Sequence, residues 1–285
     1  MPHTFSPAAE KILDRKFPVL DKGFVRLVDY MGNDGRIVQA ARVSYGAGTK
    51  TYRQDKGLIN YLLRNEHTSP FEQVVFTFHM KLPIFVARQW IRHRTARVNE
   101  ISGRYSVMAE EFYVPDAADV AFQSADNKQG RSLEAVPPAL RRKVLAILTK
   151  GQKALYRDYK ALLNSNIARE LARINLPLSL FTEWYWQIDL NNLMHFLRLR
   201  MDEHAQKEIR DYARVMYTIA QKVCPIAMEA FDEHMVSSVR LSKREMAAVR
   251  DMIRGETPAL DEREYGRLEK KMGIKMEQWS DGVME

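Results

Sequence analysis

Apolar and β-branched runs along the chain predict the strands of a sheet. Three stretches are rich in aromatic and β-branched residues and are short enough for strands. They cover residues 23–31, 73–82 and 178–188. A further short strand is predicted at Glu111–Pro115. The polar residues 116–137 that follow it are predicted to form a surface loop.

Between these runs, apolar residues recur at the 3.6-residue spacing of amphipathic helices. The spacing predicts helices over residues 6–16, 37–44, 51–65, a short helix that starts at Pro83, a long helix that starts at Pro137-Pro138, and helices over 190–204 and 205–233. Pro225 must break or kink the last of these, because proline lacks the N–H that a helix interior needs. Separated strands among long helices indicate an α+β domain, with an antiparallel sheet flanked by long helices.

The C-terminal part of the chain has a different composition. Residues 234–285 are rich in methionine and in charges of both signs, and two short helices are predicted near 242–253 and 261–271. We therefore divide the chain into one domain over residues 1–233 and a charged helical C-terminal extension over 234–285.

Composition narrows the class of protein. No apolar stretch approaches the ~20 residues of a membrane span, and the N-terminus lacks the basic and apolar regions of a signal peptide. Cys224 is the only cysteine, so intramolecular disulfides are excluded and a cytoplasmic location is favoured. We expect Cys224 to be a buried apolar residue and not a nucleophile. The formal net charge of +8 predicts an anionic partner, either a phosphorylated small molecule or a nucleic acid.

Residues 89–105 hold the densest group of candidate ligand-binding side chains. The basic residues among them are Arg92, His93, Arg94, Arg97 and Arg104. The helix from Pro83 would deliver the first three at its C-terminal end, where cations suit the helix dipole. An extended chain over 99–105 would place Glu100, Ser102 and Arg104 on one face, where a hydroxyl and a guanidinium suit a phosphate. A basic run is also typical of a solvated face or a nucleic-acid patch.

A second informative pattern lies in residues 190–204. Arg200 and His204 continue the apolar helical stripe of Leu193, Phe196 and Leu197. A guanidinium on such a stripe is costly unless it meets an anion or a strong acceptor, or unless its stem covers apolar surface. No metal-binding spacing, P-loop or Gly-x-Gly-x-x-Gly run appears. The residues alone therefore indicate a protein that binds a phosphorylated ligand.

The run Arg92-His93-Arg94-x-x-x-x-Asn99-Glu100-x-Ser102-x-Arg104-Tyr105-Ser106 resembles the signature of the flavin-dependent thymidylate synthases, RHRxxSxNExSxRYS. Arg97 stands where that family often has serine. Residues 67–72 and 189–209 also resemble the family, which often has asparagine where Asp189 and His195 stand here. The resemblance covers roughly residues 24–233.

This resemblance implies an enzyme that converts dUMP to dTMP. The implied one-carbon donor is 5,10-methylenetetrahydrofolate, and the implied hydride source is FAD reduced by NADPH. It also implies a homotetramer with its sites at subunit interfaces, with no metal and no membrane or nucleic-acid partner. Two alternatives stay open, namely a basic nucleic-acid-binding protein and a flavoprotein reductase on the same scaffold.

The resemblance also assigns residues. Arg200 is the implied catalytic residue, which stabilises charge on the pyrimidine. The implied dUMP contacts are Gln89, Trp90, Ile91, Arg92, Glu100, Ile101, Ser102, Gly103, Arg104, Arg173 and Arg200. The implied FAD contacts are Ser44, His67, Ser69, Arg92, His93, Arg94, Glu100, Asp189, Leu190, Asn191, His195 and His204.

Overall fold

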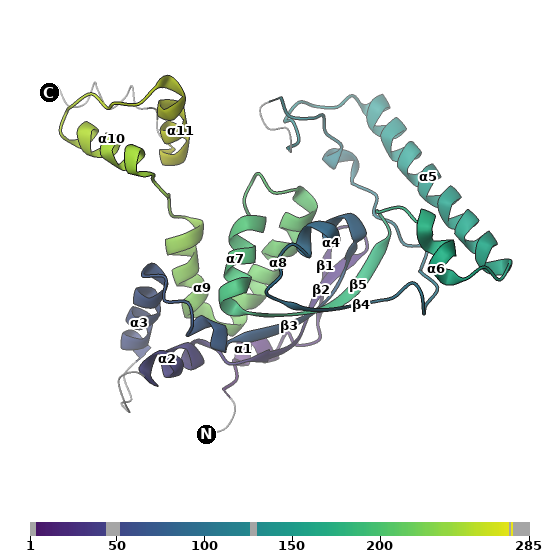
Figure 1. The fold of residues 1–285 in the computed structure, drawn as a ribbon, viewed down its shortest axis with the longest axis horizontal. Coiled ribbons are helices and arrows are strands. Elements are labelled where there is room, and N and C mark those ends of the chain that lie inside the picture. The colour runs from purple at the N-terminus through teal and green to yellow at the C-terminus, as the bar shows by residue number, and fades with distance from the viewer. Residues whose placement is uncertain (1–3, 44–51, 126–129, 274, 276–285) are drawn as a thin grey trace. The chain divides into compact units, whose positions relative to one another are not determined.

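The computed structural model describes residues 4–43, 52–125, 130–273 and 275 (Figure 1). Contacts divide the chain into two units, Met1–Phe231 and Asp232–Glu285. Within the described ranges, no helix combines the length and the apolar character needed to cross a membrane.

An antiparallel sheet forms the centre of the first unit. In the described part of the chain it has five strands in the order β1-β2-β3-β5-β4 (Figure 1). The strands are β1 (Lys16–Val19), β2 (Gly23–Met31), β3 (Val75–Pro83), β4 (Arg97–Glu100) and β5 (Phe181–Asp189). The α+β class is confirmed, and so are the three strands predicted from their β-branched and aromatic runs.

The two faces of the sheet differ because side chains alternate along each strand. The buried face includes Phe76, Phe78 and Met80 of β3 and Trp184, Trp186 and Ile188 of β5. Helices α4 (Ile84–Trp90), α7 (Leu190–Arg200) and α8 (Lys207–Val223) cover this face (Figure 1). The opposite face carries polar contacts, such as that between His79 and Glu183 at 3.0 Å.

The remaining helices of the first unit are α1 (Pro7–Glu10), α2 (Asp34–Arg42), α3 (Tyr52–Arg64), α5 (Pro138–Asn164), α6 (Arg169–Ala172) and α9 (Pro225–Phe231). The predicted break at Pro225 is confirmed. Asp34 accepts the backbone N–H groups of Ile226 and Ala227, each at 2.9 Å, at the start of α9. The helix predicted over 6–16 is wrong beyond Glu10, because residues 16–19 pair with β2.

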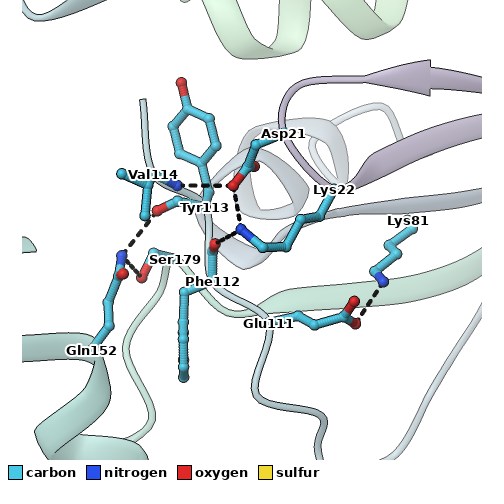
Figure 2. Close-up of polar contacts among 9 residues, drawn as sticks. All are labelled: Asp21, Lys22, Lys81, Glu111, Phe112, Tyr113, Val114, Gln152 and Ser179. Carbon is cyan, nitrogen blue, oxygen red and sulfur yellow. Dashed lines mark hydrogen bonds and ion pairs between the residues drawn. The ribbon is translucent and has the colours of Figure 1, made fainter. Parts of the chain in front are cut away.

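The strand predicted at Glu111–Pro115 is also wrong. Backbone pairing there is limited to one isolated bridge, between Phe112 and Leu180. Side chains from other elements hold the segment instead (Figure 2). The contacts are Lys81 Nζ to Glu111 Oε2 at 2.6 Å, Lys22 Nζ to the Phe112 carbonyl at 2.9 Å, and Gln152 Nε2 to the Tyr113 carbonyl at 2.9 Å.

The second unit contains a π-helical turn (Asp232–Val236) and helices α10 (Lys243–Ile253) and α11 (Glu262–Met272). Both predicted C-terminal helices are confirmed. Each begins with a capping box, formed by Ser242 with Glu245 and by Asp261 with Glu264. Lys271 Nζ lies 2.6 Å from Glu245 Oε1, and its hydrogen bond to that carboxylate lowers the pKa of Glu245 to about 2.

Candidate active site

A cavity of about 380 Å³ lies where the chain leaves β4. Its lining residues are Ile84, Glu100, Ile101, Ser102, Gly103, Met108, Arg173, Leu176, Leu180 and Thr182. Five of them were assigned to dUMP by resemblance, and they come from two segments that are far apart in sequence. The tertiary structure therefore brings Arg173 to the turn that carries Ser102.

The turn after β4 has its own local structure. The Ser102 carbonyl accepts two backbone N–H groups from the turn, and Ser102 Oγ accepts the N–H of Arg104 at 3.3 Å. An extended chain, considered for residues 99–105, therefore ends at Ser102, where the turn begins. The Arg104 side chain is more than half exposed and lies 3.4 Å from Glu170 Oε2, and it is not among the residues that line the cavity.

Gly103 allows Arg173 to approach this turn closely. A Cβ atom at position 103 would lie 3.2 Å from Arg173 Cδ and 3.2 Å from Met108 Sδ, closer than most real Cβ contacts. The stem of Arg173 therefore packs directly against the glycine backbone. Arg173 itself begins the 3₁₀ turn Arg173–Asn175, and its side chain is half-buried.

Glu100 is held by a residue that sequence reasoning missed. Thr182 Oγ1 donates to Glu100 Oε1 at 2.5 Å, and Thr182 is only 2% exposed. The bond leaves Glu100 Oε2 as the second acceptor beside the cavity. A threonine on a strand gives no sequence signal of this role, because only the pairing of β4 with β5 brings it close to Glu100.

A second group forms where α7 meets the chain after α4. Arg200 Nε donates to His93 Nε2 at 3.0 Å. The His93 ring lies 6.0 Å from the His195 ring and 4.9 Å from the Phe196 ring, measured between centroids. Burial, together with the charges of Arg200 and His195, lowers the pKa of His93 to about 4. Burial also lowers the pKa of Arg200. His93 is therefore a neutral acceptor for a partly desolvated guanidinium.

We expect the His93 imidazole to stay neutral, with its proton on Nδ1, from pH 8 down to about pH 5. The reason is that Nε2 already accepts from Arg200 and that the pKa is lowered from 6.5 to about 4. The imidazole takes up its second proton near pH 6.5 in the unfolded chain but only near pH 4 in the folded one. The free energy of unfolding therefore decreases as the pH falls from 6.5 toward 4. Long-range ¹H–¹⁵N NMR measures the tautomer and the charge.

A His93→Gln variant identifies the resonances of this ring in the same spectra. The glutamine can still offer an oxygen to Arg200, so the fold should persist. A doubly protonated His93 at pH 6, or a proton on Nε2, would contradict the expected pairing.

The other residues assigned to FAD are dispersed. His67 and Ser69 lie exposed after α3, where the His67 ring contacts the Tyr61 ring at 5.8 Å. Leu190 is fully buried and belongs to the core, and Asn191 is half-buried on the first turn of α7. Ser44 lies outside the described residues.

Asp189 and His204 have contacts at the two ends of α7. Asp189 Oδ1 accepts the Asn192 N–H at 2.9 Å, so its carboxylate caps the helix. The helix predicted over 190–204 is wrong beyond Arg200, because α7 ends there. His204 therefore does not share a stripe with Arg200. Its Nδ1 lies 2.9 Å from Asp202 Oδ1 in the following turn.

The residues on and after α4 that resemblance assigned to the ligands differ in how far they are exposed. Trp90 is fully buried, Gln89 is half-buried and Ile91 is 44% exposed. Helix α4 ends at Trp90, so Arg92 and Arg94 follow the helix and are not delivered by its last turn. Both are exposed, and neither forms an ion pair with another described residue.

The family model and the curated relatives that match this chain all point to the same family. Residues 26–226 match the family model Thy1, described as thymidylate synthase complementing protein. A flavin-dependent thymidylate synthase of Treponema denticola is 64% identical over 91% of this chain and 98% of its own. One from Rickettsia prowazekii is 52% identical over 93% of this chain and 96% of its own.

A solved structure also matches. The crystal structure of the UMP/dUMP methylase PolB from Streptomyces cacaoi, bound with 5-Br dUMP, superposes with a TM-score of 0.70. It is 34% identical in sequence, and the match covers 77% of this chain and 99% of that one.

Proposed function

Because the chain belongs to the flavin-dependent thymidylate synthases and is an enzyme that methylates dUMP, we propose that it forms dTMP with FAD, 5,10-methylenetetrahydrofolate and NADPH. The observation that carries the site assignment is the cavity that joins Ser102 and Glu100 to Arg173. A hydroxyl, a carboxylate and a guanidinium around one cavity suit the phosphate and sugar of a nucleotide.

Arg200 is the residue proposed to act on the pyrimidine. Methylation at C5 requires electron density to move into the ring, and negative charge then develops at its oxygen. Arg200 is half-buried, and its Nε is already engaged by the neutral His93, so its terminal N–H groups are directed elsewhere. A guanidinium in a partly desolvated setting stabilises such charge more strongly than one in water.

The side chains near Arg200 and His93 suit a flavin dinucleotide. Arg92 and Arg94 are exposed guanidinium groups with no ion pair among the described residues, and they flank His93 in sequence. Such groups can bind a diphosphate with paired hydrogen bonds. His93, His195 and Asn191 offer further donors. When bound and reduced, FAD would supply the hydride. Cys224 is fully buried, and burial raises its pKa, so it is not an available nucleophile.

Exposed apolar side chains support the proposed homotetramer. Segments that border the cavity or follow the signature expose Ile101, Tyr105, Leu171, Ile174 and Leu178, with Tyr105 at 78% and Ile174 at 69%. Exposed apolar side chains that gather in one patch are typical of surfaces that bind another chain. We further propose that the enzymatic domain spans residues 1–233 with 234–285 as an extension, and that the enzyme is cytoplasmic.

The visible absorption spectrum of the purified protein tests the proposal. We expect a flavin spectrum that NADPH bleaches under anaerobic conditions. The spectrum should return only when dUMP and 5,10-methylenetetrahydrofolate are both present, with dTMP formed in step. Recovery with no dTMP would favour the flavoprotein reductase. A colourless protein that FAD does not reconstitute would contradict the flavin assignment.

A further inference from the structure

Glu208 is a buried carboxylate whose place the proposed chemistry does not explain. It lies in the first turn of α8 and is 1% exposed. An acid there suits the helix dipole. Burying a charge nevertheless costs several kcal/mol unless hydrogen bonds compensate it. The partners of Glu208 therefore indicate why a charged side chain is present.

Two donors meet one oxygen of this carboxylate. Tyr113 donates its hydroxyl to Glu208 Oε1 at 2.9 Å, and Arg131 Nη2 donates to the same oxygen. Figure 2 shows that the contacts of residues 112–114 hold the backbone, while the ring of Tyr113 extends away from them. Burial alone would raise the pKa of Glu208, but Arg131 brings it below its ordinary value. Glu208 is therefore ionised and can only accept hydrogen bonds.

The other oxygen begins a chain of amides. Gln206 Nε2 donates to Glu208 Oε2 at 2.8 Å, and Gln89 Nε2 donates to Gln206 Oε1. An ionised carboxylate has no proton to give, so the amide of Gln206 must turn its NH₂ group to Glu208. The carbonyl oxygen of Gln206 then faces Gln89, which must donate a hydrogen bond from its own NH₂ group. The charge at Glu208 thus determines the orientation of two amides in succession.

We propose that Glu208 is a positioning residue that acts through Gln206 on Gln89. It holds the Gln89 amide with Nε2 toward Gln206 and leaves Oε1 as an acceptor for an N–H or O–H group of the pyrimidine nucleotide. The role of Gln89 toward dUMP rests on the proposed function. The chain of hydrogen bonds joins α4, which carries Gln89, to α8 and to the segment that carries Tyr113.

Glu208→Gln and Gln206→Met test this role in the FAD-loaded enzyme. Glutamine at 208 must turn its carbonyl oxygen to Arg131 and Tyr113, so its NH₂ group faces Gln206 and the orientation of both the Gln206 and the Gln89 amides reverses. Methionine at 206 interrupts the chain but leaves Glu208 with Tyr113 and Arg131. We expect each variant to raise the KM and the Kd for dUMP about 10-fold, with kcat at saturating dUMP within about 2-fold.

The double variant Gln206→Glu with Glu208→Gln separates positioning from a structural role. Glutamate at 206 again accepts from Gln89, and glutamine at 208 donates to it, so we expect recovery to within about 3-fold of the wild-type KM. A role based only on the ion pair with Arg131 would not be restored. Asp211→Asn, which removes an ion pair with Lys207 on the same helix, is the matched control and should leave KM unchanged.

Steady-state kinetics, calorimetric titration with dUMP and melting temperatures supply the measurements. Gln206→Met with a wild-type melting temperature and an unchanged Kd would overturn the positioning role. A double variant as weak as Glu208→Gln would also overturn it. A wild-type enzyme that neither binds nor methylates dUMP would instead overturn the proposed function, and the role of Glu208 with it.

Discussion

Replacing Arg200 with alanine is expected to lower turnover of dUMP about 10²–10³-fold while the fold and the bound flavin persist. The guanidinium is partly desolvated, and His93 holds its Nε. Its loss therefore removes a preorganised charge from the place where negative charge develops on the ring. The structure should tolerate the change, because His93 is only half-buried and water can satisfy its Nε2. Steady-state kinetics measure the turnover of dUMP, and the flavin spectrum measures whether the cofactor stays bound.

Two further variants sharpen this test. Arg198→Ala removes the other arginine from the last turn of α7 and serves as the matched control, so its turnover should stay near that of the wild type. Arg200→Lys retains a charge but not the planar guanidinium, and we expect it to recover only part of the activity. An Arg200→Ala enzyme with wild-type kcat/KM would refute the assignment.

Replacing Trp90 with alanine is expected to destabilise the protein by about 3–5 kcal/mol. The indole is fully buried among aromatic rings. Its ring lies 4.5 Å from Phe196 and 5.5 Å from Trp186, measured between centroids. Alanine would leave a large cavity between the sheet and α7. Resemblance assigned Trp90 to dUMP, but its side chain packs in the core, so any contact with the nucleotide would come from its backbone.

Trp90→Phe is the matched control. Phenylalanine keeps an aromatic ring and removes an indole N–H that has no hydrogen-bond partner among the described residues. We expect the alanine variant to melt about 6–20 °C lower than the wild type and the phenylalanine variant to lose much less. If Trp90→Ala melted like the wild type but bound dUMP weakly, the side chain would be a ligand contact and not a core residue.

Local sequence was sufficient for most of the elements. The strands predicted over 23–31, 73–82 and 178–188 and both C-terminal helices are confirmed. These segments carry their own signals, since strong β-formers line the strands and capping boxes start the helices. The family was recognisable for the same reason, because its signature is one continuous run.

Predictions of local conformation failed at two places in the first unit. The helix predicted over 6–16 ends at Glu10, and Lys16 instead begins the strand that pairs with β2. The chain after Glu100 turns at Ser102 instead of staying extended, which directs Arg104 toward Glu170. In each case hydrogen bonds between nearby residues, in a hairpin and in a tight turn, outweigh a weak local preference.

The sequence by itself determined the α+β class, the family and the residues to inspect. Only the tertiary structure decided which of them meet. It placed Arg173 against Gly103, paired Arg200 with a neutral His93, and moved Trp90 into the core. It also joined Gln89 to Glu208 through Gln206. The physical reason is that distances, burial and the direction of a hydrogen bond depend on how separate segments pack, and no local pattern of residues encodes them.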